Sequence, residues 1–243
     1  MNTTIIQIEE VIQEMKQGFS KPFLCRSDNG DEYIVKGMVS TRKSQISEWI
    51  CGHLAKLIGL PIADFSLVEI PYELWEELPF PLNEIGYGIA FGSKKVSGVN
   101  WVEKFNAGSI PESLQCKVIA FDLWIKNMDR CVANPNLLYQ AEQQKLIIID
   151  HNNAFDQSFD IDLFLESHIF RDAFSLFDDM VNRAKMEESF NEALMHFEEI
   201  YNNLPKAWHW GNQEEDIPVN YDFQFVRNTL ERLNITGELW GMK

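Results

Sequence analysis

Residues 120–155 read AFDLWIKNMDRCVANPNLLYQAEQQKLIIIDHNNAF, and two apolar runs within this stretch decide how it folds. The runs at 136–139 (NLLY) and 146–149 (LIII) have the composition of buried strands. The short, mainly polar segment 140–145 between them has the length of an antiparallel hairpin connection. Neighbouring strands lie roughly 4.8 Å apart, so the residues before the first strand and after the second should meet at the open end of the hairpin.

Three polar residues flank this hairpin: Asp129 and Asn134 precede it, and Asp150 follows it. Carboxylate and amide oxygens are ligands that Mg²⁺ accepts, and its other positions go to water and substrate phosphates. We therefore expect Asn134 and Asp150 to hold Mg²⁺, and Asp129 to orient an attacking hydroxyl group and accept its proton. Protein kinases arrange two Asp and one Asn in this way for phosphoryl transfer. The alternative is a surface turn rich in Asp and Asn, although a solvated turn does not require the apolar run before Asp150.

Composition and charge limit the classes of function. The chain has 243 residues, 45% of them hydrophobic, which is enough for a substantial core in one two-lobed unit or two small domains. The formal net charge of −16 and a pI near 4.7 argue against a general affinity for nucleic acid or for anionic membranes, because both require a cationic face.

The cysteines and the N-terminal residues predict a cytoplasmic protein. Cys25, Cys51, Cys116 and Cys131 form no C-x-x-C pair and no zinc-binding spacing with histidine, so we expect reduced thiols. The first residues, MNTTIIQIEEVIQEM, lack the basic and long apolar regions of a signal peptide. No run of apolar residues is long enough to span a membrane.

The N-terminal part begins with an expected helix and continues with an expected hairpin. Apolar residues at 5, 8, 11, 12 and 15 have helical spacing. Strand-like runs at 23–26 and 32–36 follow, separated by a turn with Asn29-Gly30, which is a strong hairpin signal. The tip of this hairpin is a candidate cover for nucleotide phosphates. Lys36, which ends the second strand, is a candidate ATP ligand; the alternative is a strand-end lysine in water.

A helix is expected at 44–58, with Ser44 as its N-cap and Gly59 and Pro61 as stop signals. In kinases a helix glutamate pairs with the strand lysine, and Glu48 is the candidate here. Helical counting places Glu48 away from the apolar stripe, beside Gly52 and Ala55, so it either faces a cleft or is solvated.

A strand is expected at 65–70 and ends at Pro71. A strand that leads into a proline-marked connection suits a hinge between lobes. We therefore expect the backbone groups of Val68, Glu69 and Ile70 to bind an adenine ring. This expectation rests on the position of the strand in the chain and not on a sequence motif.

Most of the remaining chain has helical patterns, at about 112–126, 162–184, 186–203 and 222–233. Trp208 and Trp210 are expected to pack the C-terminal helices against one another.

Taken together, five stretches resemble the HipA-like kinases, in particular the compact branch that lacks the N-terminal subdomain of full HipA toxins. They are DNGDEYIVKG at 28–37, SEWICGHLAKLIGLPIADFSLVEI at 47–70, FGS at 91–93, FDLWIKNMDRCVANPNLLY at 121–139 and IIIDHNNAF at 147–155. The last two are the most specific, whereas the C-terminal third matches only as helices.

The resemblance implies an α+β, bilobal protein-kinase-like fold, with a small β-rich N-lobe at 1–70 and a mostly helical C-lobe at 71–243. It implies that Asp129 is catalytic, that Asn134 and Asp150 hold Mg²⁺, and that Lys36 contacts ATP. Members of the family transfer phosphate to Ser or Thr of proteins, and several are toxins with an antitoxin partner.

The leading hypothesis is an ATP- and Mg²⁺-dependent protein serine/threonine kinase, with a toxin of a toxin–antitoxin pair as one biological setting. A nucleotide-binding pseudokinase that serves as an interaction module is the second hypothesis. A lipid or small-molecule kinase on the same fold is the third, because a fold alone does not select the phosphate acceptor.

Overall fold

The computed structural model describes residues 4–15, 21–104, 106–235 and 237–241. The chain forms two compact units. Unit 1 comprises residues 1–49, 63–97 and 201–221, and unit 2 comprises residues 50–62, 98–200 and 222–243. Within the described residues, no helix is both long enough and apolar enough to cross a bilayer.

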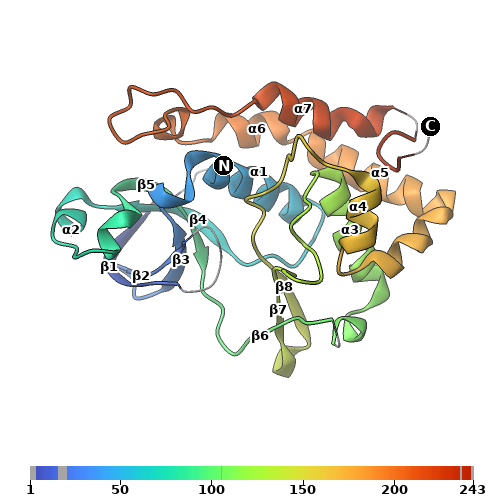
Figure 1. Ribbon diagram of the computed structural model, residues 1–243, viewed down its shortest axis with the longest axis horizontal. Helices are drawn as coiled ribbons and strands as arrows, with labels where there is room; N and C mark the ends of the chain where they lie inside the picture. Colours follow the sequence, from blue (N-terminus) through green and yellow to red (C-terminus); the bar gives the residue numbers. More distant parts are fainter. Residues whose placement is uncertain (1–3, 16–20, 105, 236, 242–243) are drawn as a thin grey trace. The chain divides into compact units, whose positions relative to one another are not determined.

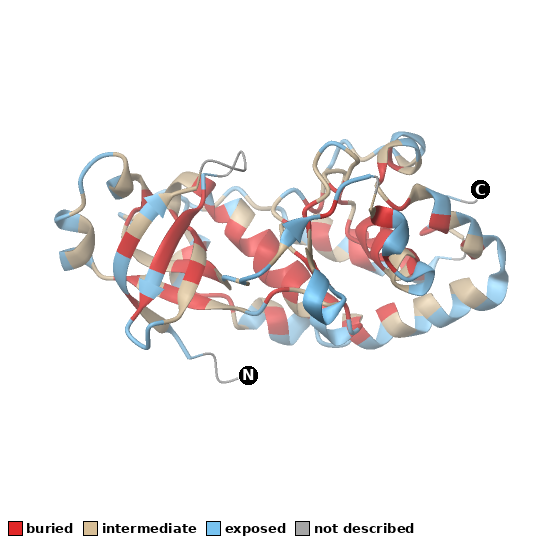
Figure 2. Ribbon diagram, turned by 90° about the horizontal axis from the view of Figure 1, so that it is seen from below, coloured by how far each residue is buried: buried red, intermediate tan, exposed pale blue. Residues whose placement is uncertain are grey.

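Five strands of unit 1 close into a barrel in the order β1-β2-β3-β5-β4 (Figure 1). They are β1 (Ile6–Glu14), β2 (Phe23–Ser27), β3 (Glu32–Lys36), β4 (Phe65–Ile70) and β5 (Gly88–Lys94). All neighbouring strands are antiparallel except β1 and β4, which run parallel. The barrel interior is apolar, with Ile8, Phe23, Val35 and Val68 almost inaccessible to solvent. Figure 2 shows buried stretches on the strands of the barrel.

The N-terminal segment is the strand β1, so the helix predicted from residue 5 onward is wrong. The pairing of β1 with β2 shifts register between Ile8 and Glu10 and again between Val11 and Gln13. Each irregularity inserts a residue into the strand, and the first one gives the buried residues Ile8 and Val11 a spacing of three instead of two. A bulged strand therefore imitated the periodicity of a helix.

The β2–β3 hairpin confirms the prediction from Asn29-Gly30. Arg26 lies opposite Glu32 in the ladder, and Gly30 has φ +84° in the turn between the strands. The following helix, α1 (Arg42–Leu57), begins two residues before the predicted start. The N–H of Ser44 donates to Oγ1 of Thr41, so the hydroxyl that caps the helix belongs to Thr41 and not to Ser44.

Unit 1 extends beyond the predicted lobe boundary at residue 70. The helix α2 (Tyr72–Glu76) connects β4 to β5, and β5 pairs with both β3 and β4 inside the barrel. Segment 201–221 also belongs to this unit. The functional division of the chain at residue 70 stays a prediction.

Trp208 packs against other residues of unit 1 and does not join the C-terminal helices together, contrary to the prediction. Its ring meets that of Trp49 edge-on at a centroid distance of 6.4 Å, and its Nε1 donates to the carbonyl oxygen of Ile89 at 2.9 Å. A tryptophan with a buried N–H requires such a partner. Segment 201–221 is thereby fixed to α1 and β5.

Unit 2 is mostly helical and carries a small antiparallel sheet of order β6-β7-β8. The helices are α3 (Glu112–Trp124), α4 (Ile161–Ser167), α5 (Met180–Leu194), α6 (Phe197–Asn202) and α7 (Phe223–Glu231). The strands are β6 (Asn100–Trp101), β7 (Leu137–Gln140) and β8 (Lys145–Ile148). Short 3-10 turns lie at Met38–Ser40, Leu82–Ile85, Ala107–Ser109, Ala141–Gln143, Arg171–Asp178, Lys206–His209 and Arg232–Asn234.

Helix α3 forms the centre of unit 2. Trp124, at its C-terminal end, stacks on Phe190 of α5 with a centroid distance of 4.4 Å and donates its Nε1–H to the carbonyl oxygen of Leu230. The helix predicted at 112–126 is confirmed, but the pattern at 162–203 divides differently. Asp179 caps α5 through the N–H of Val181, and α5 then continues through the predicted break near residue 185.

Candidate active site

Asp129 lies at the centre of a cluster of amide side chains in unit 2. Its Oδ1 accepts from Nδ2 of Asn134 at 2.9 Å, and its Oδ2 accepts from Nδ2 of Asn136 at 3.2 Å and of Asn153 at 3.1 Å. All three contacts donate an N–H to the carboxylate, so they fix its orientation as an acceptor. Such a group is suited to orient a hydroxyl group and to accept its proton.

The loop that carries Asp129 is fixed to the end of α3. Asn127 is fully buried, and its Nδ2 donates to Oδ1 of Asp122 at 2.8 Å while its Oδ1 accepts the N–H of Asp129 at 3.2 Å. The N–H of Cys131 then bonds the carbonyl oxygen of Asp129, and the N–H of Asn134 bonds that of Cys131. These bonds give the Asp129 backbone a defined place relative to the helix.

The hairpin predicted from the two apolar runs is confirmed as β7 and β8, with Leu137 opposite Ile148. The N–H of Ile149 bonds the carbonyl oxygen of Asn136 across its open end at 3.1 Å. Asn136 has φ +50° and Asp150 has φ +61°, a left-handed conformation that Asn and Asp adopt more readily than other residues with a side chain. The turn after β8 therefore returns toward Asp129, where Asn153 bonds it.

Oxygen atoms that could serve as Mg²⁺ ligands are present in the turn that follows β8 and in the loop that contains Asp129 and Asn134. Nδ2 of Asn134 donates to Asp129, so Oδ1 of Asn134 points away from that carboxylate. The Oδ1 of Asn152, two residues after Asp150, is buried without a hydrogen-bond partner in the described part of the chain. Asp150 supplies a carboxylate. The donor set fits a hard cation that keeps several water or phosphate ligands.

No group of three or more His, Cys, Asp and Glu residues is placed to hold a metal ion among the described residues. The roles of Asn134 and Asp150 as metal ligands, and of Asp129 as the catalytic residue, stay predictions.

Lys36 and Glu48 form an ion pair inside unit 1. Nζ of Lys36, at the end of β3, contacts Oε1 of Glu48 on α1, and the two residues are only 7% and 3% exposed. The sequence left open whether Glu48 is solvated; the structure shows that it is buried against the strand lysine. Kinases have a pair of this kind between a strand lysine and a helix glutamate.

Further contacts fix α1 to the barrel beside this pair. Nε2 of Gln45 donates to the carbonyl oxygen of Gly37, the residue that follows Lys36. Nη1 of Arg42 donates to Oε1 of Gln45 and to the carbonyl oxygen of Ile89 in β5. The helix that carries Glu48 is thus bound to both β3 and β5.

The backbone N–H groups at the tip of the β2–β3 hairpin, the candidate cover for phosphates, mostly bond within the protein. The N–H groups of Ser27 and Gly30 bond within the hairpin, and that of Asp28 bonds the carbonyl oxygen of Gln7. The N–H of Asp31 is bonded by the side chain of Asn29. These four donors have partners within the protein, and the phosphate-covering role of the hairpin tip stays a prediction.

The predicted adenine-binding residues Val68, Glu69 and Ile70 lie in strand β4 of the barrel. Val68 and Glu69 pair with β1 on one side of β4, and Val68, Glu69 and Ile70 pair with β5 on the other. The strand is therefore part of the barrel, and from residue 63 the chain stays in unit 1 until residue 97. Pro71 does not end unit 1, because it opens the connection to β5 of the same barrel. The binding of adenine by these backbone groups stays a prediction.

Sequence reasoning missed Asn136 and Asn153, which bond Asp129. The signal was present as a concentration of asparagine at both ends of the hairpin, in NPN at 134–136 and in HNN at 151–153. Sequence reasoning also missed a buried cluster of three polar side chains next to the Asp129 loop. It consists of Asp122, Arg130 and His168.

This buried group sets its own protonation states. Burial by itself raises the pKa of Asp122, but the charge of Arg130 and the contact with His168 hold that pKa well below its usual value. Burial lowers the pKa of His168 and outweighs the opposing effect of Asp122. His168 is therefore neutral: its Nδ1 accepts the N–H of Phe170, so Nε2 carries the proton and donates to Oδ2 of Asp122 at 3.1 Å.

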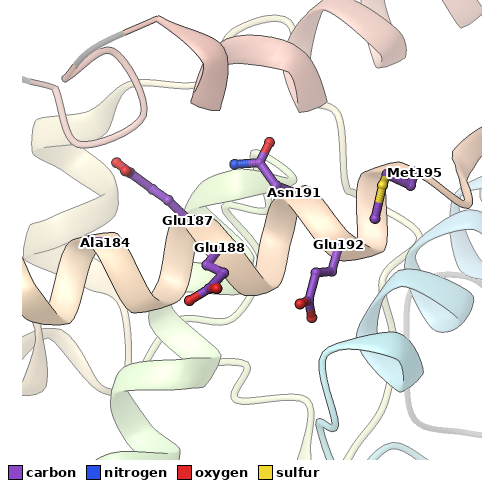
Figure 3. A pocket seen from close by; sticks show the side chains of 6 residues that line it. All are labelled: Ala184, Glu187, Glu188, Asn191, Glu192 and Met195. Carbon is purple, nitrogen blue, oxygen red and sulfur yellow. The ribbon is translucent and has the colours of Figure 1, made fainter.

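A surface hollow elsewhere in unit 2 does not match a nucleotide site. Figure 3 shows it along α5, and its lining residues are Ala184, Glu187, Glu188, Asn191, Glu192 and Met195. Three carboxylates without a lining cation repel the phosphates of a nucleotide. None of the predicted site residues lies in it.

Comparisons with known proteins concern the fold and the family of the chain. The crystal structure of the Helicobacter pylori proinflammatory kinase CtkA is similar, with a TM-score of 0.56 and 12% identity over 99% of this chain and 98% of that chain. The golgi casein kinase gives a TM-score of 0.45 and 14% identity over 98% of this chain and 73% of that chain. No curated protein matches the sequence. The likeness to CtkA shows the fold, which is α+β and protein-kinase-like.

The family follows from a separate comparison. The model of the HipA-like kinase family matches residues 8–243. This range contains the Lys36–Glu48 pair, the Asp129 loop and the hairpin that precedes Asp150. The chain belongs to the HipA-like kinase family.

Proposed function

We propose that this kinase transfers the γ-phosphoryl group of ATP to serine or threonine of a protein, with Mg²⁺ as the metal. The observation that carries the proposal is the amide cluster of unit 2, in which Asn134, Asn136 and Asn153 fix the Asp129 carboxylate beside the turn that starts with Asp150. Phosphoryl transfer depends mainly on positioning and electrostatic stabilisation, and this cluster provides positioning.

Each residue has a separate role. Asp129 orients the acceptor hydroxyl and takes its proton, and the three amides keep the carboxylate in one orientation. Asn134 and Asp150 hold the metal. Lys36, paired with Glu48, neutralises phosphate charge. Bound Mg²⁺ neutralises charge on the phosphate oxygens.

The test is transfer of labelled γ-phosphate by the pure protein, with Mg²⁺ and ATP, to a cell-extract protein mixture. Asp129→Asn and Asp150→Asn are run beside Asp172→Asn, a matched control whose side chain is 98% exposed. We expect label on protein serine or threonine with the wild type and the control, and none with the other two variants. Lipid and metabolite fractions are offered as separate acceptors.

The other outcomes identify the alternatives. ATP binding without transfer to any acceptor would indicate a pseudokinase. Transfer only to lipid or to a small molecule would replace the protein acceptor. Absence of both binding and transfer would exclude the proposed function.

We further propose a cytoplasmic toxin whose activity a partner protein restrains. The support is membership of the family together with the net charge of −16, which disfavours nucleic acid and anionic membranes as partners. Induced expression should arrest growth with the wild type and not with Asp129→Asn. Equal growth of both strains would contradict a toxic role while leaving the kinase assay unaffected.

A further inference from the structure

Arg130 follows Asp129 directly, yet its side chain points into the core of unit 2 and is fully buried. Its Nη1 lies 2.8 Å from the carbonyl oxygen of Asn136 and 3.1 Å from that of Ile149, with the carbonyl oxygen of Pro135 further away at 3.4 Å. One guanidinium nitrogen thus bonds both sides of the open end of the β7–β8 hairpin.

The two bonded carbonyls adjoin the two left-handed residues of the site. Asn136, with φ +50°, provides one carbonyl itself, and Ile149 provides the carbonyl of the peptide that leads into Asp150, with φ +61°. Residues in sparsely populated conformations persist only when surrounding contacts hold them. The Arg130 guanidinium is such a contact for both at once.

The other side of the guanidinium is fixed to helix α3. Nε of Arg130 donates to Oδ2 of Asp122 at 2.6 Å, and the same oxygen accepts from Nε2 of His168. Oδ1 of Asp122 accepts from Asn127, which also bonds the N–H of Asp129. A single carboxylate on α3 therefore supports both the catalytic loop and, through Arg130, the metal-binding turn.

We propose that Arg130 is a positioning residue for the metal site: it sets the place of the Asp150 turn relative to the Asp129–Asn136 loop and so controls metal affinity. The inference rests on the proposed function, because it takes Asn134 and Asp150 as the metal ligands. Arg130 touches neither nucleotide nor metal in this scheme and acts through the backbone on either side of the hairpin end.

A purely structural ion pair is the competing explanation. Buried pairs of this kind contribute little net stability compared with apolar residues of similar volume. What an apolar residue or a lysine lacks is the planar fork, which bonds a carboxylate and backbone carbonyls in fixed directions. The two explanations differ in what a lysine at this position does to metal affinity.

The experiment is Mn²⁺ titration, followed by electron paramagnetic resonance, with a non-hydrolysable ATP analogue bound to the full chain. Arg130→Lys is compared with the wild type and with Arg232→Lys. Arg232 is a matched control because its fork also bonds backbone carbonyls in unit 2, those of Leu123, Trp124 and Thr229, but not the hairpin end. Metal-free binding of the analogue and the melting temperature are measured for all three proteins.

We expect Arg130→Lys to weaken Mn²⁺ binding roughly tenfold to 100-fold, the size typical of groups that orient metal ligands. Its metal-free affinity for the analogue should stay within about twofold of that of Arg232→Lys, since the fork is not a nucleotide ligand. If Arg130→Lys does not fold, Asp122→Asn takes its place. In this variant an NH2 group replaces one carboxylate oxygen and faces a donor, either Nε of Arg130 or Nδ2 of Asn127, and the charge that holds the guanidinium is removed. Mn²⁺ binding should therefore weaken at least as much as in Arg130→Lys.

Equal Mn²⁺ affinity in Arg130→Lys and Arg232→Lys, at similar melting temperatures, would overturn the positioning role and leave the kinase proposal intact. Failure of the wild type itself to bind Mn²⁺ with the analogue would instead remove the proposed metal site, and this inference with it. The two failures are therefore distinguishable.

Discussion

Nζ of Lys36 contacts Oε1 of Glu48 inside unit 1, where both side chains are almost wholly shielded from water. A buried ion pair is costly to break, because removing one partner leaves an uncompensated charge. The pair is also the arrangement that kinases use to place the lysine that meets the nucleotide phosphates. Its contributions to stability and to activity can be separated by substitution.

Glu48→Gln should lower the free energy of unfolding by about 3–5 kcal/mol and phosphoryl transfer on the order of 100-fold. The double variant Lys36→Met with Glu48→Leu should recover much of the stability and none of the activity, because neither charge then remains buried. Chemical denaturation and the transfer assay measure the two effects. Lys95→Met, which removes a surface pair with Glu32, is the control and should change little. Activity that recovered with stability would contradict a role for Lys36 at the phosphates.

Asn153→Ala should lower kcat about tenfold with little change in KM for ATP, because the Asp129 carboxylate then loses one of its three amide donors. Asn228→Ala, at an exposed position of α7, is the control. Steady-state kinetics on a protein acceptor distinguish the two parameters. A rise in KM alone would place Asn153 at the nucleotide instead of at the catalytic carboxylate.

The β7–β8 hairpin around which the site is built could be predicted from the sequence, because its two apolar runs and the short polar connection between them are local signals. The same holds for the β2–β3 hairpin, which the Asn-Gly turn indicated. The Glu48 contact could not, since it depends on how α1 packs on β3. Strand β1 was misread because bulges produced helical spacing. The extension of unit 1 beyond residue 70 was missed because β5 could not be assigned to the barrel before its pairing was known. Asn136, Asn153 and Arg130 act through contacts that bring separate segments together, which periodicity does not reveal.

Stability should fall as the pH drops below about 6.5. Burial, helped by the charge of Lys56, lowers the pKa of His53 to about 4, and burial also lowers the pKa of His168. In the unfolded chain both histidines gain protons near pH 6.5, so the unfolded state binds more protons over this range and folding weakens toward acid. The contribution of the two neutral histidines to the free energy of unfolding is fully present above pH 6.5. Below that pH it decreases by at most about 1.4 kcal/mol per pH unit for each histidine.

Urea unfolding at pH 7.5 and at pH 5.0 measures this loss. His53→Gln should reduce the difference between the two pH values, whereas His209→Gln, at an exposed position, should leave it unchanged. A wild-type stability that does not change between these pH values would contradict the burial of both rings as neutral groups.

Gly37→Ala should destabilise unit 1 by about 1–3 kcal/mol, because the new Cβ would lie 2.1 Å from the carbonyl oxygen of Ile85. Backbone must move to relieve this contact, and Gly37 adjoins Lys36, so ATP binding should weaken as well. Thermal unfolding and nucleotide titration are the measurements. Gly108→Ala is the control, since a Cβ there meets no atom within 4 Å. Equal melting temperatures for the two variants would contradict the packing of Gly37 on Ile85.

Alkylation of the native protein should modify Cys131 first, because it is partly exposed while Cys25, Cys51 and Cys116 are buried. Burial also raises the pKa of Cys25 to about 12, which leaves almost none of the reactive thiolate at neutral pH. Mass spectrometry of timed samples locates the label, and Cys131→Ser should remove the fast phase. Rapid modification of Cys25 instead would show that the barrel opens in solution.

The parallel pairing of β1 with β4 has a consequence for how the protein behaves when its sheet is interrupted. A closed barrel has no edge strand, and edge strands are the places where other chains add and aggregation starts. Removal of β1 would uncover one side of β2 and one side of β4, each with unpaired N–H and C=O groups. A chain that lacks β1 should therefore associate with copies of itself. In the intact protein, β1 prevents further strands from adding to the sheet.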